Sequence, residues 1–237
     1  MNAAKSMIGD LQRYKVFGKP LWLTEFCAWD GTSSSAAQCQ FMAQSINYLE
    51  QDDDLERYAW FIPRWNQATE SAPFMQLITK AKPYELTERG ILFVNMSTFD
   101  KNAVYPCGKR IPAEHYRACS IDDSYASPAV SLCTDVNGIL QIDGLALNQW
   151  MDYKINILSG VKDFQIRYTA TRDSEIAIYR VDENGNETAL QTIALPSTAS
   201  KTAWTTLTES FTPEAGEQVL RLKCTKGLPR INWFKLK

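Results

Sequence analysis

The spacing of apolar side chains changes once along this chain, and that change constrains the fold more than any other feature. Residues 1–100 alternate helix-type patterns with short, nearly continuous apolar runs, as expected for βα units around a parallel sheet. Further on, apolar residues recur at every second position, as in Phe164, Ile166 and Tyr168, which is typical of half-buried strands. The sequence therefore predicts an α/β region followed by an all-β sandwich.

We place the α/β domain at residues 1–100, a linker at 101–109 and the sandwich at 110–237. Pro106 and Gly108 interrupt both patterns within the linker. A hairpin turn is expected at residues 182–186, because Gly185 can adopt a positive φ between two strand patterns.

In the α/β domain, helix patterns and strand-length apolar runs follow one another without an internal repeat. The predicted elements are a helix over 2–17 that ends at Gly18, a strand over 19–26, a helix over 33–51 with Thr32 or Ser33 as N-cap, a strand over 57–62 and a helix over 86–96.

Charge and hydropathy exclude several classes of function. The formal net charge is −2, with 25 basic and 27 acidic residues well mixed, so we expect no nucleic-acid partner. No apolar run reaches the roughly 18 residues of a membrane span. The first 19 residues read as an amphipathic helix and not as a signal peptide. A chain that opens in mid-helix is interpreted as truncated.

Nucleophilic triads and zinc chemistry find little support. The one histidine, His115, has no G-x-S-x-G partner. The six cysteines lack the C-x-x-C spacing of zinc and redox sites, which leaves both buried free thiols and disulfides open.

The carboxylate of Glu25 lies near the end of a predicted parallel strand, which is where barrel enzymes place catalytic groups. A salt bridge or a cap is the alternative role for such a residue. Aromatic and hydrogen-bonding side chains on or just past the same two strands are candidates for binding sugar, whereas Trp22 is expected to pack in the core. These candidate substrate-binding residues are Trp29, Trp60, Arg64, Trp65 and Asn66.

Three segments of the α/β domain carry a resemblance to a known family: Lys19–Phe26, Tyr58–Phe61 and Glu85–Gly90. Through them, residues 1–97 resemble the Asl1-like group of glycoside hydrolase family 128, whose members are TIM-barrel β-1,3-glucanases. The resemblance implies strands seven and eight of a (β/α)8 barrel and a retaining mechanism with Glu25 as nucleophile. Its acid/base glutamate, about 5 Å away, would lie on strand four and has no counterpart here. We therefore expect the N-terminal half of the barrel to be missing and this chain alone to be inactive.

Five segments of the predicted sandwich carry a second resemblance: Arg110–Tyr116, Ile142–Asp143, Trp150–Ile155, Trp204–Thr206 and Ile231–Phe234. Through them, residues 110–237 resemble a carbohydrate-binding module of family 6. The resemblance implies a structural calcium ion at Glu114 and a sugar site whose positions fall on Leu140, Lys201 and Arg230. None of these three preserves the family's aromatic or Asn residue, which leaves open a site elsewhere, an acidic ligand at Lys201 and Arg230, or a packing role. Trp150 and Trp233 are expected in the core.

Two functions remain in competition at this stage. The first is a glycoside hydrolase segment acting on β-glucan, without a catalytic cofactor, and secreted, periplasmic or at the cell surface by its resemblance. The second is a non-catalytic carbohydrate-binding or accessory protein that retains a remnant of a barrel.

Overall fold

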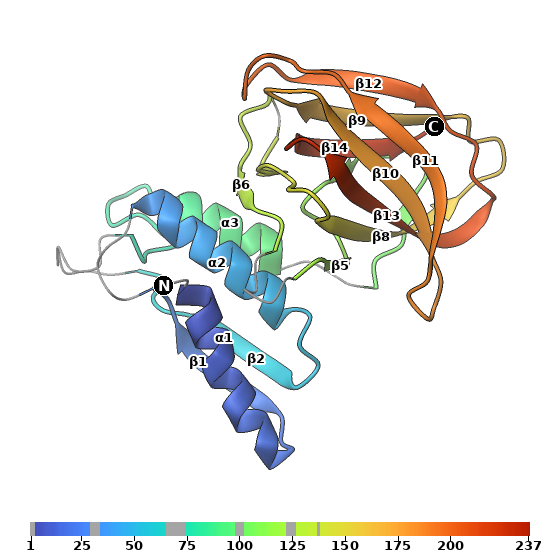
Figure 1. Cartoon of the computed structure of the whole chain (residues 1–237). Coiled ribbons are helices and arrows are strands. Elements are labelled where there is room, and N and C mark those ends of the chain that lie inside the picture. The colour runs from blue at the N-terminus through green and yellow to red at the C-terminus, as the bar shows by residue number, and fades with distance from the viewer. Residues whose placement is uncertain (1–2, 29–33, 65–73, 98–101, 122–126, 137) are drawn as a thin grey trace. The chain divides into compact units, whose positions relative to one another are not determined.

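The computed structural model shows two compact units, each described here by itself (Figure 1). One unit comprises residues 1–98 and 121–127, and the other comprises 99–120 and 128–237. The amide of Asn47 donates a buried hydrogen bond of 3.0 Å to Ser127, which ties the short segment to the first unit. The structure describes residues 3–28, 34–64, 74–97, 102–121, 127–136 and 138–237.

The helices of the first unit lie close to their predicted positions. Helix α1 (Ala3–Tyr14) continues into a 3-10 turn, η1 (Lys15–Phe17), and the left-handed Gly18, with φ 57°, ends it as expected. Helix α2 (Ser35–Leu49) begins two residues later than predicted, because the hydroxyl of Ser34 accepts the Ala37 N–H and is the N-cap. Helix α3 (Glu88–Ser97) packs beside α2 (Figure 1).

Strands β1 (Leu21–Phe26) and β2 (Leu55–Trp60) pair in parallel, which confirms the α/β character of this unit. A cluster of aromatic rings joins the sheet to α2: the rings of Phe26 and Trp60 meet edge to face at 5.2 Å, and Phe41 lies 6.1 Å from Trp60. The described strands show a small parallel sheet, and the larger barrel stays a prediction.

The prediction that Trp22 packs in the core is wrong, since this side chain is 59% exposed. Successive residues of a strand face opposite sides, and in β1 the neighbours Leu21 and Leu23 are the half-buried positions. Trp22 therefore faces outward, where its indole N–H donates to Glu56 and the guanidinium of Arg57 lies 5.1 Å from its ring centre.

The second unit is a sandwich of two sheets, as the period-two pattern predicts (Figure 1). One sheet has the order β11-β10-β13-β8-β3, with β5 on β8, and the other has the order β12-β9-β14-β7-β6, with β4 on β14. The strands are β3 (Tyr105–Pro106), β4 (Ile111–Pro112), β5 (Ala118–Cys119), β6 (Val130–Leu132), β7 (Leu140–Ile142), β8 (Trp150–Ile157), β9 (Asp163–Thr169), β10 (Ser174–Val181), β11 (Glu187–Leu195), β12 (Thr205–Ser210), β13 (Gly216–Lys226) and β14 (Arg230–Leu236).

The core between the two sheets is aromatic at its centre. Tyr153 of β8 meets Phe234 of β14 edge to face at 4.7 Å, and Phe164 of β9 stacks on Phe234 at 5.6 Å. The Tyr153 hydroxyl donates to the Ala113 carbonyl at 2.6 Å, so this buried polar group is satisfied. Trp233 is only 9% exposed, as expected, whereas Trp150 is half-buried. All six cysteines are free thiols.

Two glycines hold left-handed turns in the sandwich, for different reasons. The predicted hairpin turn is confirmed: Gly185 has φ 83°, and Asp182 accepts the N–H groups of Asn184 and Asn186. Gly227 has φ 84°, but here the chain also packs tightly. A Cβ at Gly227 would lie 2.7 Å from the Cα of Ser174, whereas a Cβ at Gly185 would meet nothing within 4 Å.

These surroundings predict unequal effects of the same substitution. Gly185→Ala should destabilise the sandwich by about 1 kcal/mol, from the left-handed backbone alone. Gly227→Ala should cost about 3 kcal/mol, because the backbone of Ser174 must also move. Chemical denaturation followed by near-UV circular dichroism measures both. Equal losses would show that the close approach at Ser174 carries no energetic weight.

Candidate functional site

Glu25 occupies the penultimate position of β1, with its side chain exposed. The Phe61 N–H donates to the Phe26 carbonyl at 3.0 Å, so the parallel strands remain joined just beyond this position. Glu25 forms no hydrogen bond or ion pair with another described residue. Burial, reinforced by the charge of Glu25, raises the pKa of the neighbouring Cys27 thiol to about 11. The site is thus an open carboxylate beside an inert thiol.

The predicted partners of Glu25 have separate environments. Trp60 is 5% exposed, and its indole N–H donates to the Met75 carbonyl at 2.7 Å, so this ring belongs to the core. Arg64 is exposed, and its guanidinium lies 4.7 Å from the ring centre of Tyr84, which leaves an arginine and an aromatic ring together on the surface. The predictions for Trp29, Trp65 and Asn66 fall outside the described residues.

The three sugar-site positions predicted for the sandwich have little in common. Leu140 is fully buried in β7 and offers no surface to a ligand. Arg230, at the start of β14, forms an ion pair with Asp143. Lys201 is exposed.

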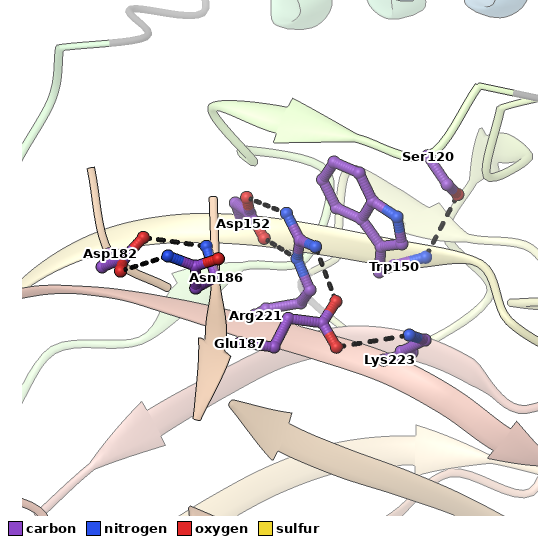
Figure 2. A network of polar contacts seen from close by, with 8 residues as sticks. All are labelled: Ser120, Trp150, Asp152, Asp182, Asn186, Glu187, Arg221 and Lys223. Carbon is purple, nitrogen blue, oxygen red and sulfur yellow. Dashed lines mark hydrogen bonds and ion pairs between the residues drawn. The ribbon is translucent and has the colours of Figure 1, made fainter. Parts of the chain in front are cut away.

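A different polar cluster lies on the sheet that contains β8, β13 and β11 (Figure 2). At its centre the guanidinium of Arg221 donates to both carboxylate oxygens of Asp152, at 2.7 and 2.8 Å. Arg221 also donates to Glu187 at 2.7 Å, and Lys223 contacts the other oxygen of Glu187 at 3.4 Å. The Asp152 side chain is 8% exposed and that of Arg221 is 12% exposed, so this is a largely desolvated network.

Two aromatic rings border the same network. The guanidinium of Arg221 lies 3.6 Å from the ring centre of Trp150, and the ammonium of Lys223 lies 5.6 Å from that of Tyr179. The strand register explains this grouping, since Tyr179 pairs with Arg221, which in turn pairs with Asp152. We define the β8–β13 face as six residues: Trp150, Asp152, Tyr179, Glu187, Arg221 and Lys223. Sequence reasoning missed it, although alternation from Trp150 to Asp152 could have indicated which residues point outward.

A hollow of about 690 Å³ opens beside the β8–β13 face. Its walls include Arg117, Trp150, Asp152 and the hairpin residues Asp182 and Glu183. Burial raises the pKa of Asp152, while the hydrogen bonds from Arg221 act in the opposite direction. The hollow therefore combines an aromatic ring, fixed charges and hydrogen-bonding groups, as a glycan site requires.

Glu114 is the one predicted metal ligand, and it is 7% exposed. Its Oε2 has no hydrogen-bond partner, and burial raises its pKa to about 7. The described residues include no group of three acidic, histidine or cysteine side chains that could hold a metal ion. Calcium usually takes six to eight oxygen ligands, which include backbone carbonyls, so calcium at Glu114 stays a prediction. Burial of a carboxyl group without a partner favours its protonated form.

Comparison with known proteins identifies both regions of the chain. The profile "Glycosyl hydrolase catalytic core" matches residues 1–93, and the profile "Carbohydrate binding module (family 6)" matches residues 113–237. The sandwich of this chain is thus a carbohydrate-binding domain, and the segment before it is of glycosidase type. The chain belongs to carbohydrate-binding module family 6. A search of curated proteins gives no match.

Several solved structures are similar to the sandwich. A family 6 module from Clostridium stercorarium, in complex with cellobiose, shares 20% identity over 57% of this chain and 98% of its own length, with a TM-score of 0.48. A β-1,3-glucan-binding module of the same family from Bacillus halodurans shares 21% identity over 57% of this chain and 99% of its own length, with a TM-score of 0.49. Among the described helices, none is long and apolar enough to cross a membrane.

The state of Glu114 can be tested through its pH dependence. A carboxyl group whose pKa rises from 4.5 to about 7 on folding lowers stability progressively between these pH values. The loss is fully present above the higher one and amounts to about 3 kcal/mol. Glu114→Gln should remove this slope, so that the variant unfolds at higher denaturant than the parent at pH 8 and at equal denaturant at pH 4. Calcium chloride that stabilises the parent but not the variant would instead favour a metal site.

Proposed function

We propose that this chain acts on polysaccharide, with the sandwich binding glycan at the β8–β13 face and the α/β unit supplying the nucleophile of a β-1,3-glucan hydrolase. The observation that carries the catalytic part is the exposed carboxylate of Glu25 near the carboxyl end of a parallel strand, within the segment that matches a glycosyl hydrolase catalytic core. In barrel enzymes that strand end is where the catalytic groups lie.

In the proposed reaction, Glu25 attacks the anomeric carbon and forms a glycosyl ester while an acid protonates the leaving oxygen. Water then hydrolyses this ester, and the configuration of the sugar is retained. The second carboxyl must lie about 5 Å from the first. Glu25 forms no hydrogen bond or ion pair with a described residue. We therefore assign the acid to another part of the barrel, beyond these two strands.

The sandwich would hold the substrate near the enzyme. Trp150 provides an apolar ring of the kind that sugars stack on, and the charged side chains around it can bond sugar hydroxyls. Domains of these two families are typical of extracellular polysaccharide-degrading proteins, and we propose the same location for this chain.

A non-catalytic accessory role is the second candidate. Two observations favour it: Trp60 is committed to the core, and Glu25 has no bonded partner among the described residues. In this case the chain binds glycan without cleaving it.

Hydrolysis of laminarin separates the two candidates. We compare the given chain with a form that is joined to the other strands of a barrel, and we expect retaining hydrolysis by the joined form. Glu25→Gln should lower kcat by about a thousandfold, because it removes the nucleophile. Glu85→Gln, also at an exposed carboxylate of this unit, is the matched control and should leave the rate unchanged. Hydrolysis that survives Glu25→Gln would exclude Glu25 as the nucleophile. If neither the given chain nor the joined form hydrolyses laminarin, the accessory role is favoured.

A further inference from the structure

Among the residues that the structure describes, Arg117 is the basic side chain of the hollow whose charge is not taken up by an ion pair. Four basic residues line this hollow, and three of them contact carboxylates: Lys154 with Glu217 at 2.6 Å, Arg180 with Glu214 at 2.6 Å, and Arg221 with Asp152 at 2.7 Å. The guanidinium of Arg117 forms no hydrogen bond or ion pair with another described residue.

The backbone holds Arg117 at the edge of the β8–β13 face. Its N–H donates to the Asp152 carbonyl at 2.8 Å, and the next residue, Ala118, pairs with Asp152 across β5 and β8. Arg117 is half-buried, and its charge acts on the Asp152 carboxylate. That carboxylate already accepts two hydrogen bonds from Arg221. Its charge therefore compensates that of Arg221, and among the described residues no carboxylate compensates Arg117.

The hollow also contains acidic side chains without a basic partner. Asp182 and Glu183 of the hairpin line it, and no basic side chain is paired with either among the described residues. The hollow therefore offers a positive charge at Arg117 and negative charges at the hairpin. A uniformly anionic chain would be repelled at the hairpin, whereas a neutral chain would leave Arg117 unpaired.

We propose that this hollow selects glycans in which a uronic acid residue accompanies neutral sugars. The uronate carboxylate would pair with Arg117, whose planar fork fits a carboxylate with two parallel hydrogen bonds. The sugar ring would meet the part of Trp150 that Arg221 leaves uncovered, and neutral sugars would lie toward Asp182 and Glu183. The inference rests on the proposed glycan binding by the sandwich and names its substrate class.

Calorimetric titration of the intact chain tests this inference with two ligands of similar size. One is a xylotriose that carries a single glucuronic acid, and the other is neutral xylotetraose. We expect the acidic ligand to bind about tenfold more tightly, since charge-assisted bonds to a guanidinium exceed neutral ones. This preference should shrink as salt is added.

Variants at Arg117 and at Lys201 test whether the preference arises in the hollow. Arg117→Gln should abolish the preference by lowering the affinity for the acidic ligand to that for xylotetraose, because it removes the guanidinium that pairs with the uronate. Arg117→Lys, which keeps the charge but loses the fork, should retain part of it. Lys201→Gln, at the exposed lysine of the alternative site, should have no effect.

Each remaining outcome counts against the inference in a distinguishable way. Equal binding of both ligands by the parent chain overturns the uronate preference and leaves glycan binding intact. A preference that is lost in Lys201→Gln but kept in Arg117→Gln assigns the acidic ligand to the other site. If the chain binds neither of these ligands, nor laminarin, nor any other glucan, the proposed glycan binding itself is overturned.

Discussion

The paired charges of Asp152 and Arg221 are the interaction on which the β8–β13 face depends. Both side chains are largely buried, so the charge of Asp152 is tolerated because Arg221 satisfies it, whereas Arg221 is satisfied by Asp152 and Glu187 together. Removing Arg221 would leave Asp152 as an unpaired buried charge, at a cost of about 3–5 kcal/mol. The pair also fixes the guanidinium against Trp150, which holds that ring in place. A surface ordered in advance loses little conformational entropy when a ligand binds.

The same requirement explains two other carboxylates in the sandwich. Asp143 pairs with Arg230, so the charge of this arginine, which was predicted to lie at a sugar site, is already compensated. Glu114 has no such partner, and its high pKa is the direct consequence. Burial with a cation keeps a carboxylate ionised, whereas burial without one favours the proton. Arg117 shows the opposite situation, because it is a cation and the neighbouring carboxylate of Asp152 already pairs with Arg221.

Local patterns in the sequence were sufficient for the elements but not for the contacts between distant segments. Period-two alternation predicts β9 and β13, and Gly185 predicts the hairpin, because backbone geometry fixes both locally. The directions of Trp22 and Trp60 depend on which side of β1 and β2 the helices cover. The partner of Arg230 lies 87 residues away in the sequence, and no local pattern reports it. For the same reason the strand end at Glu25 was predictable and the β8–β13 face was not.

The two units use carboxylates in opposite ways, and this contrast bears on function. A nucleophilic carboxylate must be accessible to the anomeric carbon, and Glu25 is exposed. Cleavage also needs a second acid beside it, which protonates the leaving oxygen. Asp152 is inaccessible and already bonded, so it can orient a binding surface but cannot attack a substrate. The proposed binding by the sandwich therefore does not use Glu25. In a chain of this design, a change in the proposed catalytic strand leaves the residues of the β8–β13 face unaltered.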